Sequence, residues 1–300
     1  MPLMDQIYKM KSGFVTVLGR TNVGKSTLLN ALVQKKVAIT TPKQQTTRTL
    51  IRAILTTDEA QIVFIDTPGL HNPHKKLGQL LIRDAEEAKA GVDILIYVVD
   101  GKERVNESLC DTLSKIQIPV IVAFNKIDDV ALDNGQFKFN AYKQLLPNAE
   151  VVEISALKKF GLDKLLTLIK SHCIEGTPFF PKDQILDHPT EFVYSEMIRE
   201  KCFRLLMQEV PHAIHVNILK QDINPETGHK LIYADIIVEK KSEKAIVIGH
   251  QGKMISKIRH LAEHSISIFN MEPVELELYV KVVEDWRDNN RYLSEYGYKK

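Results

Sequence analysis

Residues 19–27 of the 300-residue chain read GRTNVGKST, in which two glycines with four residues between them precede a lysine and a serine. Glycine has no Cβ and accepts positive φ, so such a loop can turn several backbone N–H groups into one concavity. Lys25 would reach the outer phosphates of a nucleotide, and the Ser26 hydroxyl would hold Mg²⁺. The alternative is a turn without a ligand, and the loop alone does not tell ATP from GTP. The predicted phosphate-binding loop comprises Gly19, Arg20, Thr21, Asn22, Val23, Gly24, Lys25, Ser26 and Thr27.

The motif DTPG, at 66–69, closes an apolar strand further along the chain. Asp66 would hold Mg²⁺ through a water, and the Gly69 N–H would meet a γ-phosphate. Thr67 and Pro68, between them, are counted as nucleotide contacts as well. The four-residue string is weak evidence alone, because a plain turn explains it equally well. Its position at a strand end favours the nucleotide interpretation.

The segment NKID, at 125–128, follows the apolar run VIVAF and carries the specificity signal. A carboxylate at Asp128 can accept hydrogen bonds from N1–H and from the 2-amino group of guanine, whereas adenine offers neither donor there. Asn125 would bond nearby loops and the base edge, and the Lys126 stem would cover the face of the ring. An exposed charged turn is the alternative for this string taken alone.

The string SAL, at 155–157, also follows an apolar strand. Ser155 and Ala156 are the residues assigned to the nucleotide here, with the Ala156 N–H pointing to O6 of guanine. By itself this string says nothing, and it gains weight only from its place after NKID.

The polar segment QTTRT, at 45–49, lies between the first helix and the predicted hairpin. A threonine here can complete the Mg²⁺ shell only when a γ-phosphate is present, which is how a loop becomes a switch. Thr47 is favoured over Thr46. An ordinary polar loop is the alternative if the other motifs are ignored.

The five segments occur in the order that a Mg²⁺-dependent GTPase requires, with Ser26, Thr47 and Asp66 as metal ligands. The catalytic residues would be Asn22, Lys25, Thr47 and Gly69. Leu70 follows DTPG, where Ras-like enzymes place a water-orienting glutamine, so slow intrinsic hydrolysis is expected. The Asn22 amide oxygen is a candidate ligand for a monovalent cation such as K⁺, and simple loop hydrogen bonding is the alternative for Asn22.

Along residues 13–174, short apolar runs alternate with amphipathic stretches. Nearly continuous runs such as ILIYVV indicate strands of a parallel sheet that is covered on both faces. Helices are expected over 25–34, 77–90, 106–116 and 162–173. The runs RTLIRAILTT and AQIVFIDT are separated by two residues only, which predicts an antiparallel hairpin at one side of the sheet.

The stretch 175–191 contains several prolines and has no clear periodicity. This composition predicts a linker between two domains, 1–174 and 192–300. After it come a helix near 194–209, strands near 213–223 and 230–240, and a last alternating strand in PVELELYVKV. Between these strands lies GHQG, at 249–252, flanked by helical patterns.

A G-x-x-G turn between two helices lets the backbone of a single RNA strand pack against the loop, as in KH domains. The order helix, strand, strand, G-x-x-G between helices, strand supports the type II KH arrangement. Basic side chains would add attraction that weakens with salt. A solvated basic helix is the alternative. The residues assigned to RNA are Ile248, Gly249, His250, Gln251, Gly252, Lys253 and Lys257.

Composition sets bounds on these interpretations. With 44% apolar and 26% charged residues the chain is expected to fold, and its net charge of +2 restricts any nucleic-acid surface to a local patch. The three cysteines are far apart, which fits a reducing compartment and argues against a disulfide framework or structural zinc. No secretory signal and no run of membrane-spanning length is seen.

Taken together, GRTNVGKSTLLNALV, QTTR, DTPG, NKID, SAL, IGHQGKMISKI and the trailing WRDNNRYLSEYGY resemble the bacterial Era family of GTPases over essentially the whole chain. The resemblance implies a Ras-like P-loop GTPase domain, with a mostly parallel sheet and one antiparallel edge strand, followed by an α+β type II KH domain. It implies GTP and GDP as ligands, binding to the 3′ end of 16S ribosomal RNA, and a role in maturation of the 30S subunit. It also implies a cytoplasmic monomer in loose peripheral association with the inner membrane.

One departure from the family is Thr21, where proline is usual, and this change is not expected to affect phosphate binding. Two other functions stay open. The chain could be an RNA-binding assembly factor in which GTP hydrolysis is dispensable, or a G protein whose KH-like domain binds protein instead of RNA.

Overall fold

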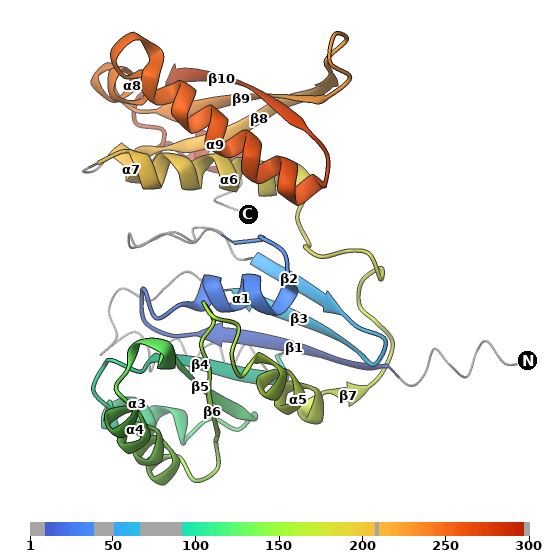
Figure 1. Cartoon of the computed structure of the whole chain (residues 1–300), viewed down its shortest axis with the longest axis vertical. Coiled ribbons are helices and arrows are strands. Elements are labelled where there is room, and N and C mark those ends of the chain that lie inside the picture. Colours follow the sequence, from blue (N-terminus) through green and yellow to red (C-terminus); the bar gives the residue numbers. More distant parts are fainter. Residues whose placement is uncertain (1–9, 39–50, 67–91, 208–209, 297–300) are drawn as a thin grey trace, which may run out of the picture. The chain divides into compact units, whose positions relative to one another are not determined.

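The computed structural model describes residues 10–38, 51–66, 92–207 and 210–296. Their contacts divide the chain into two compact units, with the boundary between Asp187 and His188 (Figure 1). The first unit contains the predicted phosphate loop, and the second contains the GHQG segment. The two glycine-containing motifs therefore belong to different compact units.

The first unit is built on a mixed sheet, of which seven strands lie in the described residues. Their order is β2-β3-β1-β4-β5-β6, with β7 beside β1. β1 pairs in parallel with β3 and β4, and β4-β5 and β5-β6 are parallel too. The predicted hairpin is confirmed, because β2 runs antiparallel to β3 at the sheet edge. The strands are β1 (Lys11–Leu18), β2 (Ile51–Thr56), β3 (Ala60–Asp66), β4 (Ile94–Asp100), β5 (Val120–Asn125), β6 (Glu150–Glu153) and β7 (Ile174–Glu175).

The helices described in this unit are α1 (Lys25–Val33), α3 (Glu107–Leu113), α4 (Leu132–Leu145) and α5 (Leu162–His172). α1, α3 and α5 lie where the sequence predicts helices, and the helix predicted over 77–90 falls outside the described residues. The sequence pattern does not predict α4, because half of the residues in LDNGQFKFNAYKQL are polar and one is glycine. Of the side chains described in α4, Phe139 and Tyr142, one turn apart, are buried and anchor the helix.

β4 shows why the central strands read as continuous apolar runs. Its side chains Leu95, Tyr97 and Val99 join the core that lies under α3 and α4. The alternate side chains, Ile94 and Ile96, are also fully buried. Because successive side chains point to opposite faces, both faces of this strand are covered.

The stretch 175–191, predicted as a linker, is held against the first sheet along much of its length. The fully buried Gln61 accepts hydrogen bonds from the backbone N–H groups of Phe179 (2.7 Å) and Phe180 (2.9 Å), and donates to the Phe180 carbonyl (2.8 Å). The Ile54 N–H also donates to the Ile185 carbonyl at 2.9 Å. Sequence periodicity misses these contacts because one buried amide side chain and single backbone bonds, and not a repeating apolar pattern, make them.

The second unit has a three-stranded sheet of order β10-β9-β8, in which β8-β9 is antiparallel and β9-β10 is parallel. Helices α6, α8 and α9 pack on this sheet (Figure 1). The predicted order of elements is therefore confirmed. The elements are α6 (Thr190–Leu205), α7 (Val210–Ala213), β8 (His215–Ile223), β9 (Lys230–Val238), α8 (Lys241–Ile248), a 3₁₀ turn (His250–Gly252), α9 (Lys253–Asn270), β10 (Val274–Val282) and α10 (Asn290–Glu295).

The C-terminal tail closes a small aromatic core at one end of this sheet. Trp286 is 1% exposed, and its indole N–H donates to the Ala213 carbonyl at 3.0 Å. Tyr296 stacks on His215 with ring centroids 4.3 Å apart. Buried aromatic groups with satisfied polar tips bind the tail firmly to the domain.

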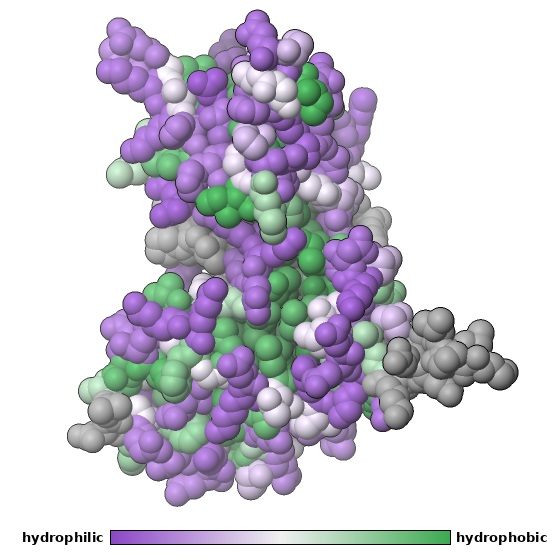
Figure 2. Space-filling view, turned by 45° about the vertical axis from the view of Figure 1, so that its right-hand side comes forward, coloured by the Kyte–Doolittle hydropathy of each residue, from purple (hydrophilic) through white to green (hydrophobic). Residues whose placement is uncertain are grey.

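The face of the molecule drawn in Figure 2 is mostly hydrophilic, with smaller hydrophobic areas. Within the part of the chain that the structure describes, no helix combines the length and the hydrophobicity that crossing a bilayer would require.

Candidate functional site

The first candidate site lies at the carboxyl ends of β1, β4 and β5. The phosphate loop follows β1, and NKID begins with the last residue of β5. Asp100, at the end of β4, is the register partner of Asn125. Neighbouring parallel strands end at one edge of the sheet, and ligands of open α/β sheets bind there.

The phosphate loop has the backbone that its glycines predict. Gly19 has φ of 152° and Gly24 has φ of 103°. A Cβ at Gly19 would approach the Val98 carbonyl to 2.5 Å, and a Cβ at Gly24 would overlap the Asn125 side-chain nitrogen. α1 begins directly after Gly24, and no side chain of the described residues caps its first turn. The helix N-terminus therefore presents backbone amides suited to an anion.

Lys25, the first residue of α1, is 8% exposed. Its Nζ donates to the carbonyls of Gly19 (2.9 Å) and Arg20 (2.8 Å). These contacts hold the ammonium beside the start of the loop. A positive charge at the loop is what the outer phosphates of a nucleotide require.

Asn125 joins three separate segments from a position that is 2% exposed. Its Nδ2 donates to the Val23 carbonyl at 2.8 Å, and its Oδ1 accepts from the Ala156 N–H at 2.9 Å. The Ala156 N–H is predicted to donate to guanine O6, and this contact stays a prediction; in this structure the N–H donates to Asn125 Oδ1. A base carbonyl at that place would share or replace this bond.

Lys126 also reaches the phosphate loop. Its Nζ donates to the Asn22 carbonyl at 2.6 Å, and both residues have positive φ, 66° and 64°. Non-glycine residues in this conformation are uncommon and mark local constraint. The side chain thus spans from the NKID segment to the predicted phosphate loop.

Asp128 lies in a 3₁₀ turn, Ile127–Asp129, where it is exposed. Ser155 is 1% exposed, and its Oγ accepts from the Lys158 N–H at 3.0 Å. Ser155 therefore stabilises the turn after β6. Asp128 is exposed, so a ligand can reach its carboxylate.

Several predicted site residues fall outside this description. Thr47, Thr67, Pro68, Gly69 and Leu70 lie outside the described residues, and the side chain of Asp66, at the end of β3, does so too. Thr21, Ser26 and Thr27 are described and belong to the loop and the first turn of α1. Of the described residues, none form a His, Cys, Asp or Glu group that could hold a metal. The predicted Mg²⁺ ligands stay predictions, because Thr47 and the side chain of Asp66 lie outside the described residues.

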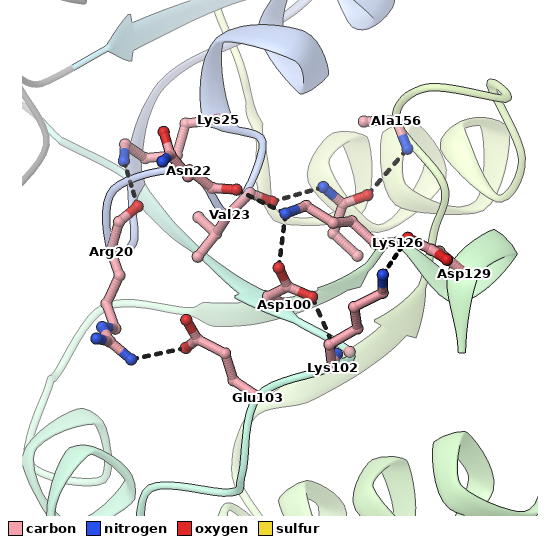
Figure 3. A network of polar contacts seen from close by, with 12 residues as sticks. Arg20, Asn22, Val23, Lys25, Asp100, Lys102, Glu103, Lys126, Asp129 and Ala156 are labelled. Atoms are coloured by element: carbon pink, nitrogen blue, oxygen red, sulfur yellow. Dashed lines mark hydrogen bonds and ion pairs between the residues drawn. The ribbon is translucent and has the colours of Figure 1, made fainter. Parts of the chain in front are cut away.

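The sequence did not single out Asp100, at the end of β4, or the Lys102 and Glu103 that follow it, whose side chains contact the phosphate loop and the NKID segment (Figure 3). Asp100 pairs with Lys126, Lys102 pairs with Asp129, and Glu103 pairs with Arg20. The available signal was positional, because Asp100 ends an apolar strand beside the strand that leads into NKID.

The second candidate site is the GHQG loop between α8 and α9. Gly249, Gln251 and Gly252 have φ of 71°, 53° and 75°. The Gly249 N–H ends α8 by donating to the Ala245 carbonyl at 2.8 Å, and the Gly252 N–H donates to the Gly249 carbonyl at 3.2 Å. The loop is thus a compact turn made of backbone.

The side chains around this turn face solvent. His250, Gln251, Lys253 and Lys257 are exposed, and Ile248 is half-buried. Within the described residues, no side chain caps the N-terminus of α9. Backbone amides with nearby lysines suit a phosphodiester strand.

Comparisons with known proteins find a match for each of the two compact units. The family model described as a 50S ribosome-binding GTPase matches residues 14–126, and the KH domain model matches residues 209–287. GTPase Era of Clostridium botulinum, strain Okra, is 41% identical over 293 residues, which are 97% of this chain and 99% of that protein. GTPase Era of strain Hall of the same species is 41% identical over 292 residues, 96% of this chain and 98% of that one.

Two solved structures have the same fold throughout. One is a single-residue variant of Aquifex aeolicus Era bound to GDP and AlF4⁻, with a TM-score of 0.85 and 36% identity, covering 97% of this chain and all (100%) of that one. The other is Era in complex with MgGDPNP and nucleotides 1506–1542 of 16S ribosomal RNA, with a TM-score of 0.84, 36% identity and the same coverage. The predicted Ras-like GTPase domain followed by a KH domain is confirmed, and the chain belongs to the Era family of GTPases.

Proposed function

We propose that this GTPase is a switch protein, which binds the 3′ end of 16S ribosomal RNA through its KH domain and acts in maturation of the 30S subunit. The observation that carries the proposal is the presence of a nucleotide loop and a G-x-x-G turn in one chain. A solved Era with this fold holds both MgGDPNP and 16S nucleotides.

In the nucleotide site, the amides around Gly24 would bind the phosphates, and Lys25 would neutralise part of their charge. Asp128 would pair with guanine while the Lys126 stem covers the ring. Bound Mg²⁺ would neutralise charge on the β- and γ-phosphates, with Ser26, Thr47 and Asp66 as its predicted ligands. No water-orienting glutamine follows DTPG, so intrinsic hydrolysis is expected to be slow.

The Asn22 side-chain oxygen would help to hold K⁺ near the phosphates. The test is the hydrolysis rate of the full chain in K⁺ and in Na⁺ at equal ionic strength. A higher rate in K⁺ supports the role, and equal rates remove it.

In the KH domain, the GHQG turn would grip the RNA backbone while Lys253 and Lys257 supply charge. Each phosphate contact releases condensed counterions, so affinity should fall as salt rises. Nucleotide would act on the RNA equilibrium only through its different affinity for the two conformational states.

The guanine site is tested by Asp128→Asn, which replaces an acceptor with an amide and should move preference from GTP to xanthosine triphosphate. Nucleotide titrations measure the preference, and 30S maturation is then followed in cells. Defective maturation supports the switch. Normal maturation in a variant that no longer binds GTP supports an assembly factor in which hydrolysis is dispensable.

The RNA site is tested by Gly252→Asp, with Gly252→Asn as the matched uncharged control. An added Cβ at Gly252 meets no atom within 4 Å, and the φ of 75° strains aspartate and asparagine alike. The difference between the two variants therefore reports the charge. Weaker binding of a 16S 3′-end oligonucleotide by the aspartate variant is expected. Unchanged binding would favour a KH-like domain that recognises protein.

The oligomeric state and the cellular location are proposed on the family resemblance alone. We expect a cytoplasmic monomer that associates loosely with the cytoplasmic side of the inner membrane. Light scattering measures the oligomeric state, and cell fractionation measures the membrane association. A stable dimer, or a protein absent from the membrane fraction at low salt, would contradict these proposals.

A further inference from the structure

Asp100 stands between the phosphate loop and the base-binding segment, although neither motif includes it. Its side chain is 12% exposed, at the end of β4. One carboxylate oxygen, Oδ2, accepts from Lys126 Nζ at 2.6 Å, and the other, Oδ1, accepts from the Lys102 backbone N–H at 2.9 Å. Figure 3 shows the carboxylate between these two partners.

The Lys126 ammonium is consequently held by two acceptors from different segments. The Asn22 carbonyl belongs to the phosphate loop, and the Asp100 carboxylate belongs to β4. With both bonds made, the lysine side chain is fixed along its length while it remains 34% exposed. A lysine otherwise has many rotamers, and fixing it before a ligand arrives lowers the entropy lost on binding.

We propose that Asp100 is a positioning residue for the guanine nucleotide, acting through Lys126. It holds the lysine stem extended as a preformed apolar surface for the guanine ring, an inference that rests on the proposed place of the base beside NKID. Asp100 itself does not touch the nucleotide in this arrangement. Its removal should therefore weaken nucleotide retention and leave the chemical step alone.

The surrounding contacts keep the backbone of this segment in place without the Asp100 carboxylate. The Gly101 N–H donates to the Asn125 carbonyl at 2.8 Å, and Lys138 Nζ donates to the Gly101 carbonyl at 2.8 Å. Lys102 also forms an ion pair with Asp129. A substitution at Asp100 can thus change the lysine contact with little change of the fold.

The most selective substitution is Asp100→Asn, because the retained oxygen can still accept from the Lys102 N–H while the amide removes the negative charge. Losing one charge-assisted hydrogen bond should speed GDP dissociation about tenfold and raise KM in proportion. The kcat for GTP should stay unchanged. Stopped-flow release of fluorescent GDP from the full chain and steady-state hydrolysis measure these three quantities.

A double-mutant cycle separates this role from general destabilisation. Lys126→Met removes the ammonium and keeps a long apolar stem, so adding Asp100→Asn to it should cause no further loss. Glu59→Gln is a control for removing the charge of a paired carboxylate elsewhere, because Glu59, 79% exposed, forms a 2.8 Å pair with Lys170 at the β2–β3 turn, away from the strand ends that carry the site. This control should leave GDP dissociation unchanged.

Three outcomes would overturn the proposal: unchanged GDP dissociation in Asp100→Asn, an equal added loss in the Lys126→Met background, or a fall in kcat. Thermal unfolding without nucleotide identifies any loss caused by misfolding, and such a loss counts against the proposal too. Failure of the guanine assignment itself would look different, because Asp128→Asn would then leave nucleotide preference unaltered.

Discussion

The nucleotide site and the GHQG loop both depend on glycine, but they are built by different means. In the nucleotide site, Asn125 and Lys126 contact backbone carbonyls of Val23 and Asn22, about a hundred positions away in the chain. In the GHQG loop, positive φ angles and short-range backbone bonds within 245–252 produce the turn. The first site is a tertiary assembly of side chains, whereas the second is a local conformation of the main chain.

This difference predicts which substitutions each site tolerates. The nucleotide site should be sensitive to substitution of any side chain that hydrogen-bonds two segments, because each such side chain holds two loops in place. The GHQG loop should tolerate changes of side-chain shape as long as its backbone angles remain possible. Five substitutions, in four experiments ordered from the largest expected effect to the smallest, test this contrast.

Gly24→Ala should have the largest effect, on nucleotide affinity. The new Cβ would overlap the Asn125 side-chain nitrogen, and alanine would be strained at φ of 103°. Strain and displacement together are expected to cost about 3 kcal/mol, or roughly 100-fold in GDP affinity. Calorimetry measures the affinity, and Gly176→Ala, where a Cβ meets nothing within 4 Å, is the control. Equal affinities in the two variants would refute the assembly argument.

Asn125→Ala should destabilise the first unit. It leaves the Val23 carbonyl and the Ala156 N–H without their Asn125 partner in a site that is 2% exposed. A loss of about 2–3 kcal/mol in the free energy of unfolding is expected. Urea unfolding measures it, and the transition of the second unit should not move. If both units lost stability equally, the separation drawn between them would be wrong.

Gly249→Ala and Gly252→Ala form a matched pair in the GHQG loop. At Gly249 a Cβ would meet Met254 Cβ at 2.6 Å, while at Gly252 it would meet nothing within 4 Å, and both residues have positive φ. The alanine at 252 should cost only the conformational penalty of about 1 kcal/mol, and the alanine at 249 should cost more. RNA titrations should rank the variants accordingly. The reverse ranking would show that backbone space does not govern this loop.

Glu239→Gln should have the smallest effect, on the tail of the KH domain. A hydrogen bond and the charge of Arg287 lower the pKa of Glu239 below its ordinary value of 4.5. A lowered pKa stabilises the fold above pH 4.5, and this contribution is lost as the pH falls through the folded-state value. Because Arg287 is 47% exposed, less than about 1 kcal/mol is expected. Urea unfolding at neutral and acid pH should show a smaller pH dependence in the variant.

Much of the fold could be predicted because short runs of apolar residues, and the spacing between them, determine where its strands lie. The apolar runs located the strands, and the two-residue spacing at 58–59 forced the β2–β3 hairpin. The helix α4 was missed because half of its residues are polar, and the packing of 179–185 was missed because it depends on the Gln61 side chain and on a backbone bond from Ile54. Pattern analysis detects repeating burial and overlooks single polar anchors.

The sequence by itself determined the phosphate loop, the order of the nucleotide motifs and the G-x-x-G turn. Each is a run of adjacent residues whose chemistry depends on spacing along the chain. Only the tertiary structure decided that Asp100 meets Lys126 and that Ala156 donates to Asn125. Those contacts depend on which strands lie side by side, and strand order follows from burying the whole sheet rather than from any short segment.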